Sequence, residues 1–102
     1  MPNKSKAKGN RFEREIVEAV ELHDIKCVRA WGSNGKALGC HEEVDILIND
    51  DIKVQAKVRK VLPKWIKPSE HVDIQVIKED RGRIYIVQEL NDWILSIKKD
   101  LK

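Results

Sequence analysis

Apolar and polar residues alternate strictly along residues 52–58, which is the pattern of a β-strand with one buried face. The apolar positions are Ile52, Val54, Ala56 and Val58, and the polar positions are Lys53, Gln55 and Lys57. Residues 43–48 alternate in the same way, and the intervening Asn49-Asp50-Asp51 has the chemistry of a turn. The pattern therefore predicts a hairpin of two half-buried strands.

Residues 11 to about 23 carry the three- and four-residue spacing of an amphipathic helix. Glu13 falls inside the apolar arc of this helix, whereas the other glutamates of the segment fall outside it. Two interpretations of Glu13 stay open. Asn10 and Glu13 have the spacing of a capping box, with Asn10 as the N-cap. Alternatively, Glu13 directs its carboxylate from the helix toward the sheet.

The remaining pattern predicts a short strand at residues 27–31, a glycine-rich loop, and a pair of strands near the C-terminus. The further elements are an irregular or helical piece between Pro63 and Pro68, strands at 72–77 and 83–88, and a helix from 90 to about 99. The order α-β-β-β-(α)-β-β-α indicates a mixed α/β or α+β fold. We expect one domain over residues 1–102, with residues 1–9 as a basic, flexible arm.

The composition fits a small globular protein, since 36% of the 102 residues are charged and 41% are hydrophobic. The sequence has no apolar run that would span a bilayer and no apolar stretch of a secretory signal at its start. We therefore expect no membrane partner and an intracellular, cytoplasmic location. Cys27 and Cys40 do not have the spacing of a zinc motif, and we expect buried or inert thiols; Cys40-His41 is only a weak indication of a metal ligand.

The net charge of +3 is mild, but the basic residues are unevenly placed. One group lies in the first fourteen residues, and a second follows the predicted hairpin, where Arg59, Lys60, Lys64 and Lys67 surround Trp65. Such clusters favour a polyanionic partner, of which nucleic acid is the commonest. A lysine-rich solvated surface would give the same composition, so charge alone does not decide.

Pairing across the predicted hairpin brings polar groups together. If Ile46 lies opposite Val54, the apolar faces of both strands agree, and a one-residue slip would turn one of them outward. Asp45 then lies opposite Gln55, with Cβ atoms roughly 4.5–5.5 Å apart, and Lys57 faces Glu43. Asp45, Gln55 and Lys57 are therefore expected to converge on one patch.

This patch has the donors of a magnesium site, because Mg²⁺ prefers hard oxygen ligands and few protein groups. Asp45 would be the main anionic ligand, Gln55 Oε1 and the carbonyl oxygen of Ala56 would be neutral ligands, and Glu13 would act directly or through water. Lys57 would orient the attacking water and offset negative charge on a phosphoryl group.

These residues resemble a known family. Asp45 followed after nine residues by Gln55-Ala56-Lys57 resembles the core motif of the PD-(D/E)XK nuclease superfamily. The segment from Lys8 to Glu15 resembles the KGxxxERE opening of archaeal and phage-type Holliday junction resolvases. Cys27 to Ser33 resembles their next segment, in which a strand carries an arginine into a Gly-Ser loop. The resemblance covers about half of the chain, from Lys8 to about Lys57.

The resemblance implies a restriction-endonuclease-like fold, with a central mixed sheet flanked by helices, and a homodimer that cuts opposed strands of a branched DNA junction with Mg²⁺, for which Mn²⁺ can substitute. It implies that Glu13 is the helix carboxylate, Asp45 the central metal ligand and Lys57 the catalytic lysine. Ser33 matches a loop serine near the scissile phosphate, and Arg29, Lys8 and Arg11 match positions that hold the DNA backbone. With the basic clusters, the residues assigned to DNA contact are Lys8, Arg11, Arg14, Arg29, Lys36, Arg59, Lys60 and Lys64.

Two positions depart from the family pattern. Val44 stands where a proline is common, and Gln55 stands where the second acidic ligand is expected, which removes one negative charge and should lower metal affinity. We expect a metal-dependent DNA endonuclease, and the short sequence favours structure-specific over sequence-specific cutting. The alternatives are a restriction, homing or repair-type nuclease, a nucleic-acid-binding module with an inactive metal site, and a small α/β interaction protein.

Overall fold

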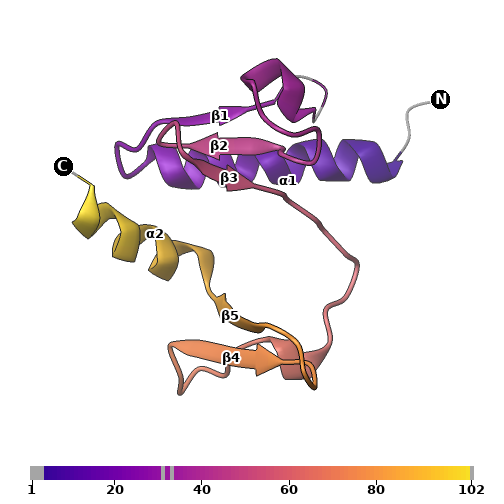
Figure 1. Ribbon diagram of the computed structural model, residues 1–102, viewed down its shortest axis with the longest axis vertical. Helices are drawn as coiled ribbons and strands as arrows, with labels where there is room; N and C mark the ends of the chain where they lie inside the picture. The colour runs from indigo at the N-terminus through magenta and orange to yellow at the C-terminus, as the bar shows by residue number, and fades with distance from the viewer. Residues whose placement is uncertain (1–3, 31, 33, 102) are drawn as a thin grey trace. The chain divides into compact units, whose positions relative to one another are not determined.

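The computed structural model describes residues 4–30, 32 and 34–101 of the chain (Figure 1). The chain divides into two compact units, Met1–Val58 and Arg59–Lys102, and each is described by itself. Both combine helix and antiparallel strands, so the expected α+β class is confirmed.

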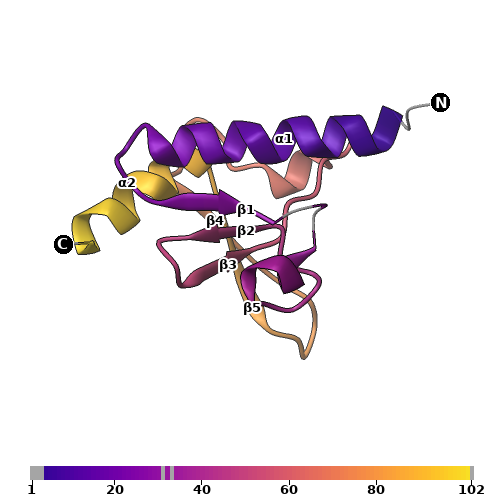
Figure 2. The same ribbon diagram turned by 90° about the horizontal axis from the view of Figure 1, so that it is seen from above.

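The first unit is a helix packed on a three-stranded sheet. Helix α1 (Lys4–Glu21) contacts strands β1 (Cys27–Arg29) and β2 (Ile46–Ile48), and β3 (Ile52–Val54) completes the antiparallel order β1-β2-β3. Figure 2 shows α1 running along one face of this sheet. The core residues come from the predicted apolar positions: Ile16, Val20, Ile25, Cys27, Ala30, Val44, Ile46 and Ile48 are buried.

Helix α1 begins at Lys4 and not at Arg11, so Asn10 lies inside the helix and is not its N-cap. The capping-box interpretation of Asn10 and Glu13 is therefore wrong, because interior N–H groups already bond to carbonyl groups one turn earlier. The lysines and alanine of residues 4–8, assigned to the arm, are good helix formers and extend the helix. Gly9 costs the helix only about 1 kcal/mol relative to alanine.

The predicted hairpin register is confirmed. Ile46 pairs with Val54 and Ile48 with Ile52, and the turn between them places Asn49 and Asp50 at φ 54° and 62°. Asparagine and aspartate tolerate this left-handed conformation better than most residues. All three strands are shorter than expected, because β1 ends at Arg29, β2 starts at Ile46 and β3 ends at Val54.

The loop between β1 and β2 holds the short 3₁₀ helix η2 (Gly35–Leu38), which begins with the Asn34 side chain accepting a hydrogen bond from the Lys36 N–H at 3.0 Å. Gly35 is buried, and a side chain at this position would overlap the carbonyl oxygen of His41 and the side chain of Val44. The loop is therefore packed against the segment that leads into β2.

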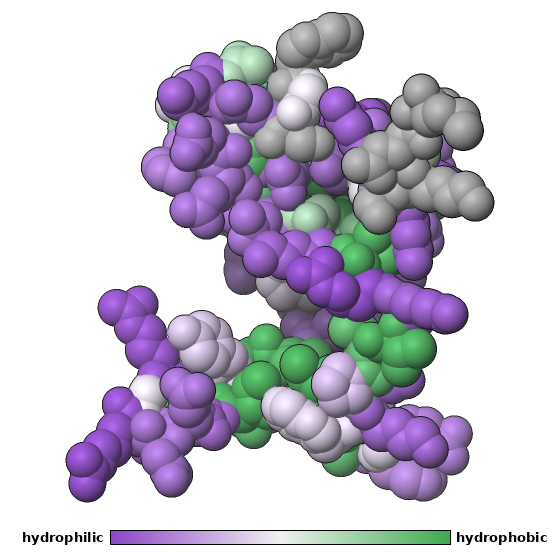
Figure 3. Space-filling model, turned by 90° about the vertical axis from the view of Figure 1, so that its right-hand side faces the viewer, coloured by the Kyte–Doolittle hydropathy of each residue, from purple (hydrophilic) through white to green (hydrophobic). Residues whose placement is uncertain are grey.

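The second unit contains a two-stranded antiparallel sheet and a helix. Its elements are the 3₁₀ helix η3 (Lys64–Ile66), β4 (Ile74–Lys78), β5 (Ile84–Gln88) and α2 (Leu90–Asp100), in the predicted order. The Glu89 side chain caps α2 by accepting a hydrogen bond from the Asp92 N–H at 3.1 Å. Apolar side chains gather on the surface of this unit (Figure 3), including Trp65, Val76, Ile84 and Ile86.

The strands of the described residues form two antiparallel sheets, and the single mixed sheet that the resemblance implies is not confirmed. The five strands occur in the expected chain order, but β4 and β5 pair only with each other. Over the described ranges, no helix combines the length and apolar character needed to cross a membrane.

Candidate functional site

Two carboxylates, those of Glu13 and Asp45, are the buried charged groups of the described chain, at 5% and 9% exposure. Burying a carboxylate is costly unless hydrogen bonds or an opposite charge compensate it. Glu13 comes from α1 and Asp45 from the residue that precedes β2, so both lie in the first unit. The contacts of each carboxylate show which groups compensate the cost of burying it.

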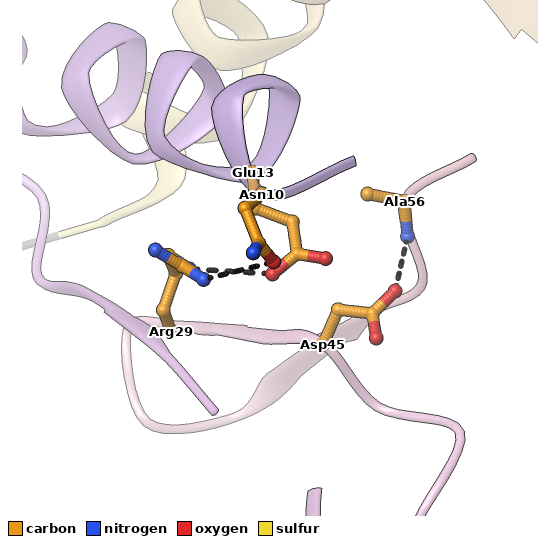
Figure 4. Close-up of polar contacts among 5 residues, drawn as sticks. All are labelled: Asn10, Glu13, Arg29, Asp45 and Ala56. Atoms are coloured by element: carbon orange, nitrogen blue, oxygen red, sulfur yellow. Dashed lines mark hydrogen bonds and ion pairs between the residues drawn. The ribbon is translucent and has the colours of Figure 1, made fainter. Parts of the chain in front are cut away.

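Glu13 is held by Arg29 at the end of β1. Arg29 Nε donates to Glu13 Oε1 at 3.2 Å, and Arg29 Nη2 donates to Asn10 Oδ1 at 3.4 Å (Figure 4). Asn10 and Glu13 lie one turn apart on α1, at the spacing that brings side chains together. Arg29 therefore bridges two side chains of the same helix face, although the family resemblance implies that it contacts DNA.

Asp45 is fixed through its backbone and its side chain. Its N–H donates to the Val54 carbonyl oxygen at 2.9 Å, and its carbonyl oxygen accepts from the Ala30 N–H at 2.8 Å. Its carboxylate oxygen Oδ2 accepts from the Ala56 N–H at 2.8 Å. Within the described ranges, the other oxygen, Oδ1, has no hydrogen-bond partner.

The two carboxylates face a common region between α1 and the hairpin. Figure 4 shows Glu13 Oε1 at the Arg29 side and the second Glu13 oxygen turned toward Asp45 and Ala56. The structure thus brings together Glu13, Asp45 and the backbone of Ala56. Of the two interpretations of Glu13, the one in which its carboxylate is directed toward the sheet agrees with this geometry.

Gln55 and Lys57 follow β3 and are both exposed, whereas Ala56 between them is half-buried. The ladder stops at Ile46 and Val54, so the expected pairings of Asp45 with Gln55 and of Lys57 with Glu43 are not strand pairs. The reason is local: the Asp45 carboxylate takes the Ala56 N–H that a continuing ladder would use. The alternation of exposure nevertheless continues to Val58.

The basic residues assigned to DNA are placed in different ways. Lys8, Arg11 and Arg14 are exposed on α1 but, at about 100° per residue, lie more than about 90° from Glu13 around the helix axis. Lys36 is exposed in η2 and lies 3.8 Å from Glu42. Arg59, Lys60 and Lys64 are exposed residues of the second unit. Ser33 lies outside the described residues.

Lys6 is a basic residue on the Glu13 face of α1 that the sequence pattern did not indicate as part of the site. It precedes Glu13 by seven residues, so both lie on the same face of α1 two turns apart. Lys6, Asn10 and Arg29 line a pocket of about 390 Å³ together with Ala30 and Gly32. The seven-residue spacing from Glu13 is the sequence feature that indicates this position of Lys6. The predicted helix starts at residue 11, however, and leaves Lys6 in the arm.

Cys27 and Cys40 are both free cysteines, the first buried and the second half-buried. Cys27 is buried, and burial, aided by the negative charge of Glu21, raises the pKa of its thiol to about 11. Cys40 is half-buried, and its Sγ lies 3.7 Å from the Leu38 carbonyl oxygen. His41 Nδ1 accepts a hydrogen bond from the Glu43 N–H at 3.1 Å. These contacts point to loop packing around Cys40-His41.

The oxygen donors of Glu13, Asp45, Gln55 and Ala56 fit Mg²⁺ by chemical type, since two are carboxylates and two are neutral carbonyl oxygens. In the part of the chain that the structure describes, no three His, Cys, Asp or Glu residues cluster closely enough to hold a metal ion. A metal site here would therefore depend on two acids and on Gln55.

Searches of family models, of curated proteins and of solved structures gave no match to this chain.

Proposed function

We propose that the protein is a metal-dependent DNA endonuclease that hydrolyses phosphodiester bonds inside the cell, and specifically a Holliday junction resolvase of restriction-endonuclease-like fold. One observation carries the proposal: the two buried carboxylates, Glu13 and Asp45, face the same region beside the backbone that leads to Lys57. A solvated surface patch would not need two buried acids, each with its own partner.

Asp45, Gln55 Oε1, the carbonyl oxygen of Ala56 and Glu13 are the groups proposed to hold Mg²⁺ or Mn²⁺. A bound divalent cation would supply Lewis-acid stabilisation of the charge that develops on the scissile phosphate. The hydrogen bonds on Asp45 keep its carboxylate in place before substrate binds, so little reorganisation is needed during the reaction.

Lys57 is proposed as the catalytic lysine. Its side chain is exposed and comes from the segment that Asp45 holds through the Ala56 N–H. An ammonium group there would donate hydrogen bonds to the attacking water and to a phosphate oxygen, and its positive charge would offset the growing negative charge. The resemblance to resolvases supports a branched substrate and a homodimer, with one site for each of the opposed strands.

A nucleic-acid-binding module with an inactive metal site is the second candidate. The observation that favours it is Gln55, which leaves the site with two carboxylates. Such a module would bind the same DNA through its basic residues but would gain nothing from Lys57.

A cleavage assay separates the two candidates. Purified protein with Mg²⁺ or Mn²⁺ is expected to cut a synthetic four-way junction faster than a linear duplex of the same sequence. Lys57→Ala should abolish cutting, whereas Lys53→Ala, an exposed lysine of the same polar strand face, should not. Binding of the junction without cleavage by the wild-type protein, with either metal, would reject the nuclease and favour the binding module.

A further inference from the structure

Arg29 makes two contacts that both lead to α1. The guanidinium is a rigid planar fork, and its Nε and Nη2 groups engage Glu13 and Asn10 respectively. Asn10 carries no net charge, so its contact adds a directional hydrogen bond and no second ion pair. Two donors on two acceptors fix the plane of the fork more firmly than a single ion pair would.

This fixed fork determines how Glu13 is presented. A glutamate side chain has several rotatable bonds, and ordering it at the moment of binding would cost free energy. Because Oε1 is bonded to Arg29, the second oxygen is turned toward Asp45 and Ala56 (Figure 4). The ordering of Glu13 therefore takes place when the chain folds and not when a metal binds.

The same contacts argue against bidentate binding of a DNA phosphate by Arg29. Bidentate binding of a phosphate uses two neighbouring N–H groups of the guanidinium. Nε and Nη2 are the pair engaged by Glu13 and Asn10, so such binding on that edge would require both contacts to break. The side chain is also only 27% exposed.

We infer that Arg29, held by Asn10, is a positioning residue that orients Glu13 for metal binding. This inference rests on the proposed function, because it gives a role to two residues next to the proposed metal site. Groups that orient metal ligands in this way typically alter metal affinity by about 10- to 100-fold when changed.

The first measurement is Mn²⁺ affinity in the absence of DNA, by calorimetric titration of the full chain. Arg29→Lys keeps the positive charge but loses the fork, and it should weaken Mn²⁺ binding by about 10-fold. Asn10→Ala removes one of the two contacts without changing any charge and should weaken binding, by less than Arg29→Lys does. Asn10→Asp keeps an acceptor oxygen and should restore the affinity. Glu15→Gln, an exposed position of the same helix, is the matched control.

The second measurement is junction affinity in EDTA, by fluorescence anisotropy. For a positioning role, Arg29→Lys and Asn10→Ala should bind DNA within about twofold of wild type, and the cleavage rate should fall at saturating DNA with KM unchanged. A phosphate contact predicts the reverse: weaker DNA binding for Arg29→Ala, a salt slope smaller by about one, and unaltered Mn²⁺ affinity. That result would overturn the inference while leaving the nuclease proposal intact.

The contacts themselves are tested by urea unfolding, without metal or DNA. Asn10→Ala and Glu13→Gln should be energetically coupled in the wild-type background and uncoupled in an Arg29→Ala background, because Arg29 links them. Additive effects in both backgrounds would overturn the inference. A wild-type protein that neither binds Mn²⁺ nor cuts DNA would reject the proposed function, and the positioning role would fall with it.

Discussion

The Asp45 carboxylate accepts a hydrogen bond from the Ala56 N–H at 2.8 Å, just beyond Ile46 and Val54, the last pair of the hairpin. The same aspartate donates its own N–H to Val54 at 2.9 Å. Asp45 thus closes the end of the hairpin, and its carboxylate lies beside the region toward which Glu13 points (Figure 4). One residue serves both the stability of the hairpin and the proposed chemistry, and these two roles can be separated.

Asp45→Asn should preserve the hairpin and abolish DNA cleavage. The amide oxygen can still accept from Ala56, so the free energy of unfolding should fall by about 1 kcal/mol or less. Asp45→Ala leaves the Ala56 N–H without its partner and should cost about 2–3 kcal/mol. Urea unfolding gives both values, and a junction-cleavage assay should show no activity for either variant. Equal stability of Asp45→Ala and wild type would contradict the role of the hydrogen bond.

Lys57→Ala should leave stability unchanged. The side chain is exposed, and such substitutions usually alter the free energy of unfolding by no more than about 0.5 kcal/mol. Cleavage should fall to background while junction binding in EDTA stays near the wild-type value, because backbone affinity comes from the basic groups together. Retained cleavage in Lys57→Ala would remove Lys57 from the mechanism.

Gln55→Glu should tighten metal binding and keep or raise the cleavage rate. The substitution adds a third carboxylate to the proposed ligand set, beside those of Glu13 and Asp45, and Mg²⁺ favours anionic oxygen ligands. Mn²⁺ titration of the two proteins measures the first effect, and the metal concentration at half-maximal rate measures the second. Weaker Mn²⁺ binding in the variant would mean that Gln55 is not a ligand.

Arg59→Ala and Lys60→Ala should weaken binding to every DNA substrate by a similar factor. Both side chains are exposed, and contacts to phosphates carry no sequence information. Each lost phosphate contact should reduce the slope of log K against log salt concentration by about one. Lys98→Ala, at the C-terminal end of α2, serves as a comparison for loss of one positive charge.

The Cys27 thiol should make stability depend on pH above neutrality. Its pKa is raised to about 11 by burial and by Glu21, whereas in the unfolded chain it titrates near 9. The unfolded state therefore loses its proton first, and the stabilisation present below about pH 9 is lost as the pH rises to about 11. Comparing the urea unfolding of wild type and Cys27→Ala across this range isolates the effect, because the variant should show a smaller fall. An identical fall in both proteins would exclude it.

Local patterns predicted the parts of the fold that depend on periodicity. The hairpin register followed from matching apolar faces around Asn49-Asp50, and the burial of Glu13 followed from its place in the apolar arc of the helix. The closing helix and the two strands before it were placed within a few residues of their observed bounds. Each of these features is fixed by residues that are close together in the chain.

Contacts between distant residues decided the features that the sequence did not reveal. Asn10 looked like a helix cap because Glu13 follows it at the spacing of a capping box, but Arg29, nineteen residues later, bonds its side chain inside a longer helix. Residue 56 looked like a strand residue, but the Asp45 side chain takes its N–H. No spacing rule expresses either contact, because each depends on how α1 and the β-strands pack.

Gly35 shows that the packing behind the proposed metal site includes a residue of the loop between β1 and β2. It lies against His41 and Val44, and Val44 is the direct neighbour of Asp45. A methyl group at Gly35 must displace the segment of His41 and Val44, which leads directly into Asp45. Gly35, ten positions before Asp45 and without a side chain, is therefore required by the packing of the segment that carries a proposed metal ligand.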